Sequence, residues 1–461
     1  MNARPLLAAA LAAVLATATA SAVAARPPNL VVIMTDDQGY HDVGFNGGKD
    51  IPTPHLDSIA RNGARFTDGY VAYAVCSPSR AAFLTGRYGQ RFGYERNPRY
   101  QPGNPRSGLA RTETTMADAL KAVGYRTGLV GKWHLGAHPD LHPLRRGFDE
   151  FFGHLGGGHR YLPEELTIEN HTQAANDEAR SYRTWIHRNH EPVRTAKYLT
   201  DELSDAAVDF IARSHATPFF LYLAYNAPHA PLQAPDSYLQ RVAHVKEPRR
   251  RTYAAMVTAV DDGVGRVLAE LERHGLTGDT VIFFLSDNGG PTADNASSNR
   301  PLRGNKGSLW EGGIRVPFAA QWPGKIKAGT VFQHPVISMD IFATIAAAAN
   351  APLPAERPLD GVNLLPYLSG ERKGAPHEML FLRMFDRGAY AVRAGPYKLI
   401  IPEKDAPAEL YHLRRDIGEK ENIAAAQPEI VADLQRRRAA WEAQMIEPAF
   451  EGLIVNRPNA K

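Results

Sequence analysis

A single cysteine, Cys76, is the most reactive side chain in the sequence. It is the only cysteine among 461 residues, and it opens the run 76–80, which reads CSPSR. A chain with one cysteine cannot form an internal disulfide, so a structural bridge is excluded as its role. Pro78 suits the first turn of a helix, which places Cys76 at the helix amino end, where free amides favour an anion. Arg80, one turn further on, is expected to face the same site. The alternative is a small buried side chain at an ordinary helix start.

Acidic and amide side chains follow two expected strands directly at their carboxyl ends. They lie in the runs 35–39 (TDDQG) and 286–290 (SDNGG). The chemically interesting members are Asp36, Asp37, Asp287 and Asn288. In open α/β sheets this edge is where ligands bind. Three carboxylates would repel one another without a cation, and all-oxygen ligation suits calcium or magnesium. Turn and helix-cap chemistry is the alternative for each run.

Two lysines and two histidines complete the candidate set. Lys132 and His134 follow the expected strand 125–130 and, two residues apart, are placed to point the same way. His229 lies in a loop framed by prolines, although a single loop histidine is more often a bystander. Lys306 lies in a glycine-rich segment whose backbone can approach a ligand closely.

The elements that must position these side chains predict an α/β fold. Short apolar runs alternate with longer amphipathic segments, which is typical of a mostly parallel sheet flanked by helices. The expected strands are 30–34, 125–130, 219–224 and 281–285, and the expected helices are 54–62, 113–123, 195–213, 253–274 and 339–349.

The pattern changes after about residue 366. Four short strand-like runs precede one helix, which predicts a small antiparallel sheet plus helix. The runs are 379–384, 389–394, 397–401 and 409–412, and the helix is 428–444. We therefore expect three parts: residues 1–25 as a signal peptide, 26–370 as the catalytic α/β domain and 371–461 as an α+β subdomain.

The amino end predicts export. Residues 1–25 carry one arginine, an apolar stretch and then small residues, which is typical of a cleavable signal peptide. The apolar stretch is shorter than the roughly 20 residues that span a bilayer. We expect a periplasmic or secreted protein without stable membrane insertion, with a retained anchor as the alternative. The net charge of +4 is scattered along the chain, so nucleic acid is not an expected partner.

Residues 76–80, followed by TGR at 85–87, resemble the signature of the formylglycine-dependent type I sulfatases. The resemblance, to arylsulfatase and N-acetylgalactosamine-sulfatase-like members, extends from residue 29 to residue 413. It implies an alkaline phosphatase-like α/β fold. It also implies that a maturation enzyme oxidises the cysteine to formylglycine (3-oxoalanine).

Carried over residue by residue, the resemblance also implies roles. The implied ligands of a calcium ion are Asp36, Asp37, Cys76, Asp287 and Asn288. Arg80 would stabilise the hydrated aldehyde, and Lys132 and Lys306 would hold the sulfate oxygens. His134 would be the base beside the formylglycine, and His229 would serve the leaving group. A hydrated aldehyde has two hydroxyls on one carbon, so one attacks sulfur and the other later ejects sulfate.

One segment departs from the pattern. Some members place a serine in the pocket where this chain has residues 153–159, which contain none. We expect His159 and Arg160 to contact the substrate outside the sulfate pocket, with an ordinary surface loop as the alternative.

The leading hypothesis is a sulfuric ester hydrolase that acts on a sulfated carbohydrate or an aryl sulfate ester. A phosphonate or phosphodiester hydrolase with the same modified residue is the alternative within enzymes. Two further alternatives keep Cys76 as a thiol: a non-catalytic binder of sulfated glycans, and a cysteine hydrolase that uses His134 or His229. The sequence carries no prediction of oligomeric state.

Overall fold

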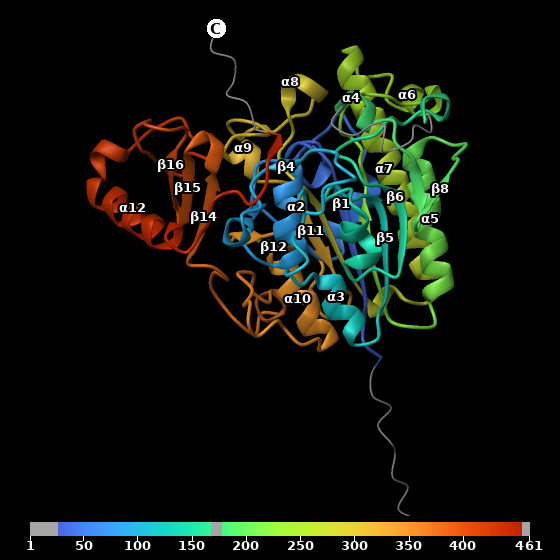
Figure 1. Cartoon of the computed structure of the whole chain (residues 1–461). Helices are drawn as coiled ribbons and strands as arrows, with labels where there is room; N and C mark the ends of the chain where they lie inside the picture. The colour runs from blue at the N-terminus through green and yellow to red at the C-terminus, as the bar shows by residue number, and fades with distance from the viewer. Residues whose placement is uncertain (1–25, 167–177, 454–461) are drawn as a thin grey trace, which may run out of the picture.

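The computed structural model describes residues 26–166 and 178–453, so the expected signal peptide lies outside the described residues. A large sheet with helices on both faces forms the body, and a smaller sheet with one helix lies at its side (Figure 1). Within the described ranges, no helix is both long enough and apolar enough to cross a membrane.

The large sheet has ten strands. In chain order they are β1 (Asn29–Thr35), β2 (Ala64–Phe66), β5 (Arg126–Lys132), β6 (Glu150–His154), β7 (Ile186–Arg188), β8 (Glu191–Val193), β9 (Phe219–Ala224), β10 (Thr280–Ser286), β11 (Phe318–Gln321) and β12 (Thr330–Phe332). Their order across the sheet is β12-β2-β11-β10-β1-β9-β5-β6-β7-β8. The central strands β10, β1, β9, β5 and β6 are all parallel, and antiparallel pairs occur towards the two edges. The carboxyl ends of the central strands therefore meet at one edge.

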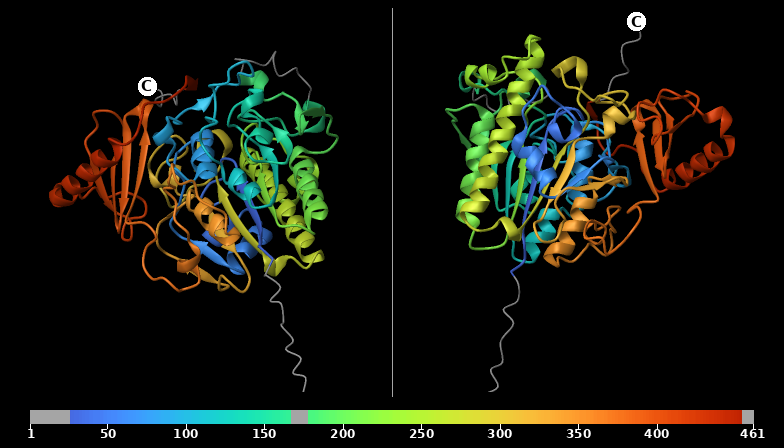
Figure 2. Two further views of the ribbon diagram at one scale, coloured as in Figure 1. Left: turned by 60° about the horizontal axis from the view of Figure 1, so that its bottom comes forward. Right: turned by 180° about the vertical axis from the view of Figure 1, so that it is seen from behind.

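Helices cover both faces of this sheet (Figure 2). The main ones are α1 (Pro54–Arg61), α2 (Cys76–Thr85), α3 (Met116–Ala122), α5 (Leu199–Ser214), α7 (Pro248–Arg273) and α10 (Asp340–Ala349). Helices α1, α5 and α7 pack together on one face, and α2, α3 and α10 pack together on the other. The predicted α/β class, with its alkaline phosphatase-like mostly parallel sheet, is confirmed.

Strand β1 shows why this sequence forms a central strand. Its side chains alternate between faces, as strand geometry requires. Leu30 and Val32 pack in the cluster that contains α2, α3 and α10, whereas Val31 and Ile33 pack in the cluster that contains α1, α5 and α7. Every residue of β1 is buried. Each such aliphatic side chain contributes about 1.5–3 kcal/mol to folding.

Four of the expected helices begin at other residues: α5 begins at Leu199 and α10 at Asp340, and the caps of α3 and α7 explain where those two begin. Helix α3 begins at Met116 because Thr115 and Asp118 form a capping box. Helix α7 begins at Pro248, before the expected residue 253, because the Glu247 side chain accepts hydrogen bonds from the first backbone amides. Near the start of α7, Arg250 pairs with Asp42 and Asp50.

The smaller sheet follows the predicted pattern. Its strands are β14 (Met379–Met384), β15 (Ala389–Ala394), β16 (Tyr397–Ile401) and β17 (Glu409–His412), all antiparallel, and α12 (Pro428–Glu442) covers them. The four expected strand ranges are confirmed, and the helix ends two residues before the expected 444. The domain boundary at residue 370 stays a prediction.

Several contacts join the smaller sheet to the body, among them the Arg383–Glu95 ion pair and the two features that follow. The ammonium of buried Lys398, on β16, lies 3.0 Å from Glu311 and 2.7 Å from Glu419. Beyond α12 the chain returns to the body, where β18 (Gly452–Leu453) pairs with β4 (Asn97–Pro98). The described carboxyl end therefore lies against a loop of the large domain.

Candidate active site

Four neighbouring strands deliver the candidate side chains to one edge of the sheet. Asp36 and Asp37 follow β1, Asp287 follows β10, Lys132 ends β5, and His229 lies in the loop after β9. These strands are adjacent in the order β10-β1-β9-β5. The expected convergence at the carboxyl edge is therefore what the structure shows.

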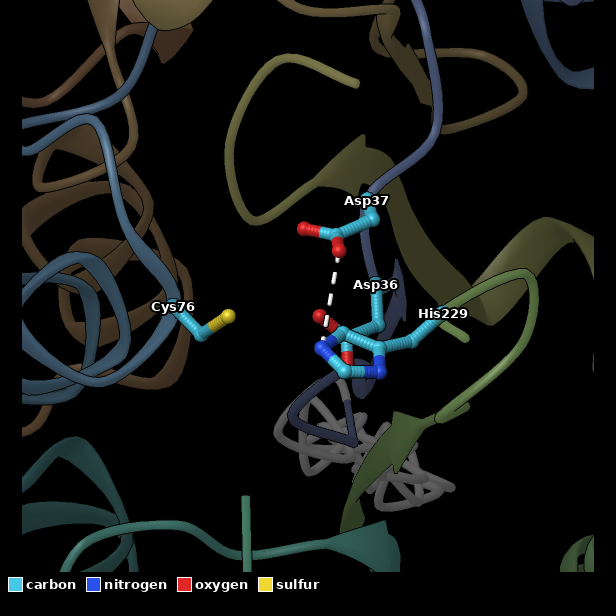
Figure 3. A group of neighbouring side chains, drawn as sticks. All are labelled: Asp36, Asp37, Cys76 and His229. Atoms are coloured by element: carbon cyan, nitrogen blue, oxygen red, sulfur yellow. Dashed lines mark ion pairs between the residues drawn. The ribbon is translucent and has the colours of Figure 1, made fainter. Parts of the chain in front are cut away.

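Helix α2 brings the cysteine to this edge. Single ligand atoms of Asp36, Asp37, Cys76 and His229 all lie within 4.8 Å of one another. Figure 3 shows the thiol of Cys76 facing the two carboxylates and the His229 ring from the opposite side. Cys76 is 1% exposed, and both carboxylates are buried. Reactions at Cys76 therefore take place in a pocket largely shielded from solvent.

The two acidic segments are bonded directly to each other. Asp37 adopts a left-handed backbone conformation (φ 67°), and its N–H donates to Asp287 Oδ1 at 3.2 Å. The Asn288 amide nitrogen donates to Asp37 Oδ1 at 2.7 Å. Burial raises the pKa of Asp37, but Lys306 and His229 outweigh it and lower that pKa to about 2. Asp37 is therefore an anion at neutral pH.

Three cations interleave with the carboxylates. Lys132 donates to Asp36, and Arg80 Nε donates to Asp287 Oδ2 at 2.8 Å. The Lys306 ammonium lies 2.7 Å from Asp37 Oδ1. Charges of both signs therefore alternate through the pocket, which is how buried charges are compensated.

The thiol of Cys76 is acidic for a cysteine. Burial alone would raise its pKa, but the ammoniums of Lys132 and Lys306 lower it from 9.0 to about 7. Lys306 Nζ lies 3.1 Å from Cys76 Sγ. The pocket therefore favours negative charge at position 76.

The pKa values of His134 and His229 are shifted in opposite directions. Burial, Lys132 and Arg80 hold the pKa of His134 well below its ordinary value, so this ring is neutral. Burial also acts against the charged form of His229, but Asp36 and Asp37 raise its pKa above 6.5. Opposite shifts of this kind set one group up as a base and the other as an acid.

The donor set fits a hard cation. Asp36 Oδ1 and Asn288 Oδ1 are buried and have no hydrogen-bond partner among the described residues. Leaving a buried polar oxygen without a partner is costly. These two oxygens adjoin the carboxylates of Asp37 and Asp287, and such an all-oxygen set suits calcium. The residues present therefore fit the expected metal.

The structure does not bring His159 to this cluster. Its ring is 1% exposed, with Nδ1 2.9 Å from the Arg160 carbonyl and Nε2 2.8 Å from the Thr184 carbonyl. Both ring nitrogens are therefore engaged by backbone. The Arg160 guanidinium pairs with Glu165 and is 37% exposed, and its contact with substrate stays a prediction.

Sequence reasoning missed the residues that hold the amino end of α2. The Ser77 N–H donates to Asn97 Oδ1 at 3.0 Å, and the Ser77 hydroxyl lies 2.8 Å from Tyr94 Oη. Tyr94 lies in a loop and Asn97 in the two-residue strand β4, which is too short to give a periodic signal. His154, a buried residue at the carboxyl end of β6 and beside Lys132 in register, was not predicted either. Its place at a strand end was the available signal.

A family model described as Sulfatase matches residues 28–351. A second model, described as the C-terminal part of N-sulphoglucosamine sulphohydrolase, matches residues 305–444. Together the two models cover every strand of both sheets.

Individual proteins are also similar to this chain over most of its length. Steryl-sulfatase of Mus musculus is 36% identical, over 82% of this chain and 72% of its own. N-acetylgalactosamine-6-sulfatase of Mus musculus is 37% identical, over 77% of this chain and 68% of its own. The crystal structure of Ps i-CgsB superposes with a TM-score of 0.85 at 37% identity, over 92% of this chain and 94% of that one. That protein has also been crystallised with k-i-k-neocarrahexaose.

Proposed function

We propose, given that this chain belongs to the sulfatase family, that it releases inorganic sulfate from a sulfated carbohydrate. Family membership makes the chain a sulfuric ester hydrolase. The position of Cys76 is the observation that supports the proposed reaction. Its thiol lies at the amino end of α2, beside the Asp36 carboxylate and 3.1 Å from the Lys306 ammonium.

Two groups are implied at this site. We propose that a formylglycine-generating enzyme converts Cys76 and that calcium is held by Asp36, Asp37, Asp287, Asn288 and the modified residue. A formylglycine supplies, as its hydrate, one hydroxyl to attack sulfur and a second whose deprotonation later expels sulfate. A calcium ion supplies positive charge against the sulfate oxygens.

The cationic side chains bind and orient the sulfate. Lys132 and Arg80 are fully buried, and each is held by a carboxylate. The Lys306 side chain is 18% exposed. Fixed cations of this kind offset charge on the transferring group without reorganising during the reaction. The sulfate end of the substrate is therefore expected deepest in the pocket.

The histidines move the protons. His134 is neutral and is the proposed base for the hydroxyl that expels sulfate. The carboxylates of Asp36 and Asp37 raise the pKa of His229, and its side chain is 12% exposed, against 3% for Asp37. It is the proposed acid for the departing alcohol oxygen, which must lie towards solvent because the rest of the substrate follows it.

Relatives support a carbohydrate as the alcohol. One similar protein is an N-acetylgalactosamine-6-sulfatase, and the Ps i-CgsB structure was obtained with k-i-k-neocarrahexaose. The structural match to Ps i-CgsB covers 92% of this chain. A polysaccharide or glycosaminoglycan type of substrate is the proposal that these matches favour.

The test combines a mass measurement with an assay. Protein made in a host with a formylglycine-generating enzyme is cleaved with trypsin, and the mass of peptide 66–80 is measured by mass spectrometry. We expect an aldehyde in place of the thiol, sulfate release from sulfated oligosaccharides, and no release by Cys76→Ala. An intact thiol together with activity would contradict the proposed nucleophile. Faster hydrolysis of the phosphate ester of the same alcohol would contradict the proposed reaction.

We also propose that the protein is exported and that residues 1–25 are removed. The support is the composition of that segment. Amino-terminal sequencing of the protein from the periplasm or the medium tests this. A mature chain that begins at about residue 26 is the expected result, and an uncleaved, membrane-bound chain would contradict it.

A further inference from the structure

The amino end of α2 is capped from a distant segment. Val75, the residue before the helix, makes no side-chain cap. Asn97 takes this role, because its Oδ1 accepts the Ser77 N–H at 3.0 Å. A side-chain oxygen at this position satisfies an amide that the helix leaves unpaired. Asn97 therefore fixes the backbone immediately after Cys76.

The same serine is bonded to the backbone of the proposed base. The Ser77 hydroxyl donates to the His134 carbonyl at 2.5 Å and lies 2.8 Å from the Tyr94 hydroxyl. Ser77 and Tyr94 are both buried. The residue that follows Cys76 is thus linked directly to His134.

His134 depends on such contacts for its orientation. Its backbone is in the left-handed region (φ 58°), which costs a non-glycine residue of the order of 1–3 kcal/mol. Its N–H donates to the Leu155 carbonyl at 3.2 Å, and its carbonyl accepts from Ser77. These two bonds hold the two peptide groups that flank His134, and so they fix the backbone from which the ring projects.

The carboxyl-terminal segment supports Asn97 and Tyr94. Leu453 pairs with Asn97 in the β18–β4 ladder. The ring of Phe450 lies 5.0 Å from the ring of Tyr94, edge to face. The Ala449 N–H donates to the Gly93 carbonyl at 2.9 Å. Residues 449–453 therefore lie along the loop that holds Ser77.

We propose that Ser77 and Asn97 are positioning residues that fix residue 76 relative to His134, and that residues 449–453 hold Asn97 in place. This proposal rests on the proposed sulfatase reaction, in which residue 76 and His134 act together. Neither Ser77 nor Asn97 is assigned any contact with substrate. They act by fixing the relative positions of residue 76 and His134. A misplacement of reacting groups by about 1 Å can lower the reaction rate about 100-fold.

The variants separate positioning from general stability. Ser77→Ala removes the bond to His134, whereas Ser77→Thr keeps a hydroxyl. Asn97→Ala removes the cap, whereas Asn97→Asp keeps the acceptor oxygen. The matched controls are Ser58→Ala and Asn104→Ala, which remove equivalent side-chain bonds to backbone at half-buried positions away from Cys76.

With an aryl sulfate ester, we expect both pocket alanine variants to lower kcat about 10- to 100-fold with KM within about twofold of the wild type. The conservative variants should keep kcat within about threefold, and the controls should match the wild type. Phe450→Ala should lower kcat less than Asn97→Ala does. Rates are expressed per formylglycine, which is measured from peptide 66–80. Unchanged kcat in both alanine variants, or a rise in KM alone, would overturn the proposal.

A second measurement needs no turnover. Hydrogen–deuterium exchange at the Ser77 amide should be faster in Asn97→Ala than in the wild type and unchanged in Asn104→Ala. Equal exchange in all three proteins would overturn the proposed cap. A wild type that hydrolyses no sulfate ester would instead count against the proposed function, while the exchange result would still decide the role of Asn97.

Discussion

The ammonium of Lys306 lies 3.1 Å from the sulfur of Cys76, from a segment 230 residues further along the chain. The same ammonium lies 2.7 Å from Asp37. A lysine held between a carboxylate and position 76 stabilises negative charge there, whether on a thiolate or on the oxygen of a transferring group.

The first prediction concerns the unmodified, metal-free protein. Lys306 lowers the pKa of Cys76, which is about 7. Removing a cation destabilises the thiolate, so Lys306→Met should raise this pKa towards the ordinary 9.0. Since the chain has one cysteine, thiolate absorbance titrated with pH reports this group alone. Lys325→Met, at an exposed lysine, is the control. An unchanged titration in Lys306→Met would contradict the assigned electrostatics.

The second prediction concerns metal. Asp36→Asn removes a charge from the oxygen set, so calcium should raise the melting temperature of the wild type but hardly that of the variant. A chelator should abolish wild-type sulfate release, and added calcium should restore it. Asp209→Asn, at an exposed carboxylate, should behave as the wild type. A calcium-induced shift of equal size in Asp36→Asn would rule out the proposed site.

The third prediction concerns the leaving group. If His229 protonates the departing oxygen, its loss should matter most when that oxygen is strongly basic. His229→Gln should therefore lower kcat/KM for a sulfated sugar about 100-fold or more, and much less for a nitrophenyl sulfate. His215→Gln, at an exposed histidine, is the control. Equal losses on the two substrates would argue for a binding role instead.

The fourth prediction concerns the junction of the two sheets. Lys398→Met leaves the buried carboxylates of Glu311 and Glu419 without their ammonium. We expect the free energy of unfolding to fall by about 3–5 kcal/mol at pH 8. Lys197→Met, which removes an exposed pair, should leave the free energy of unfolding nearly unchanged. Denaturant titration measures both.

The loss in Lys398→Met should shrink as pH falls. Burial raises the pKa of Glu419 from 4.5 to about 7, even beside Lys398. A raised carboxyl pKa favours the folded state below 4.5, and this contribution is lost as pH rises through about 7. The unpaired carboxylate in the variant is therefore protonated more readily at pH 6 than at pH 8. A loss that grows on acidification would contradict this assignment.

Much of the site was predictable because its residues follow apolar strands. Phe219–Ala224 is buried on both faces, and its unbroken apolar run marks it as a strand. Once such strands are parallel, the residues after them must meet, which is why Asp36 and Asp287 were expected together. The change to short strand-like runs after about residue 366 also distinguished the small antiparallel sheet from the large one.

Other contacts were not predictable, for physical reasons. Strand β6 has glycine and histidine beside its aromatic residues, so its apolar run is too short to stand out. Asn97 bonds to Ser77 from 20 residues further along the chain, beyond the end of α2, and no sequence period records such a contact. His159 lies in a glycine-rich loop that looks exposed in sequence, but the fold encloses its ring.

Synthesis proceeds from the amino end, so α2 is made long before the segments that enclose it. Lys306 follows Cys76 by 230 residues, and Asp287 follows Asp37 by 250. While the growing chain lacks those segments, the CSPSR run is accessible to a macromolecule. Once they have arrived, the thiol is 1% exposed. Any enzyme that remodels this cysteine therefore competes with folding itself, and the yield of mature protein is set by the relative speeds of the two.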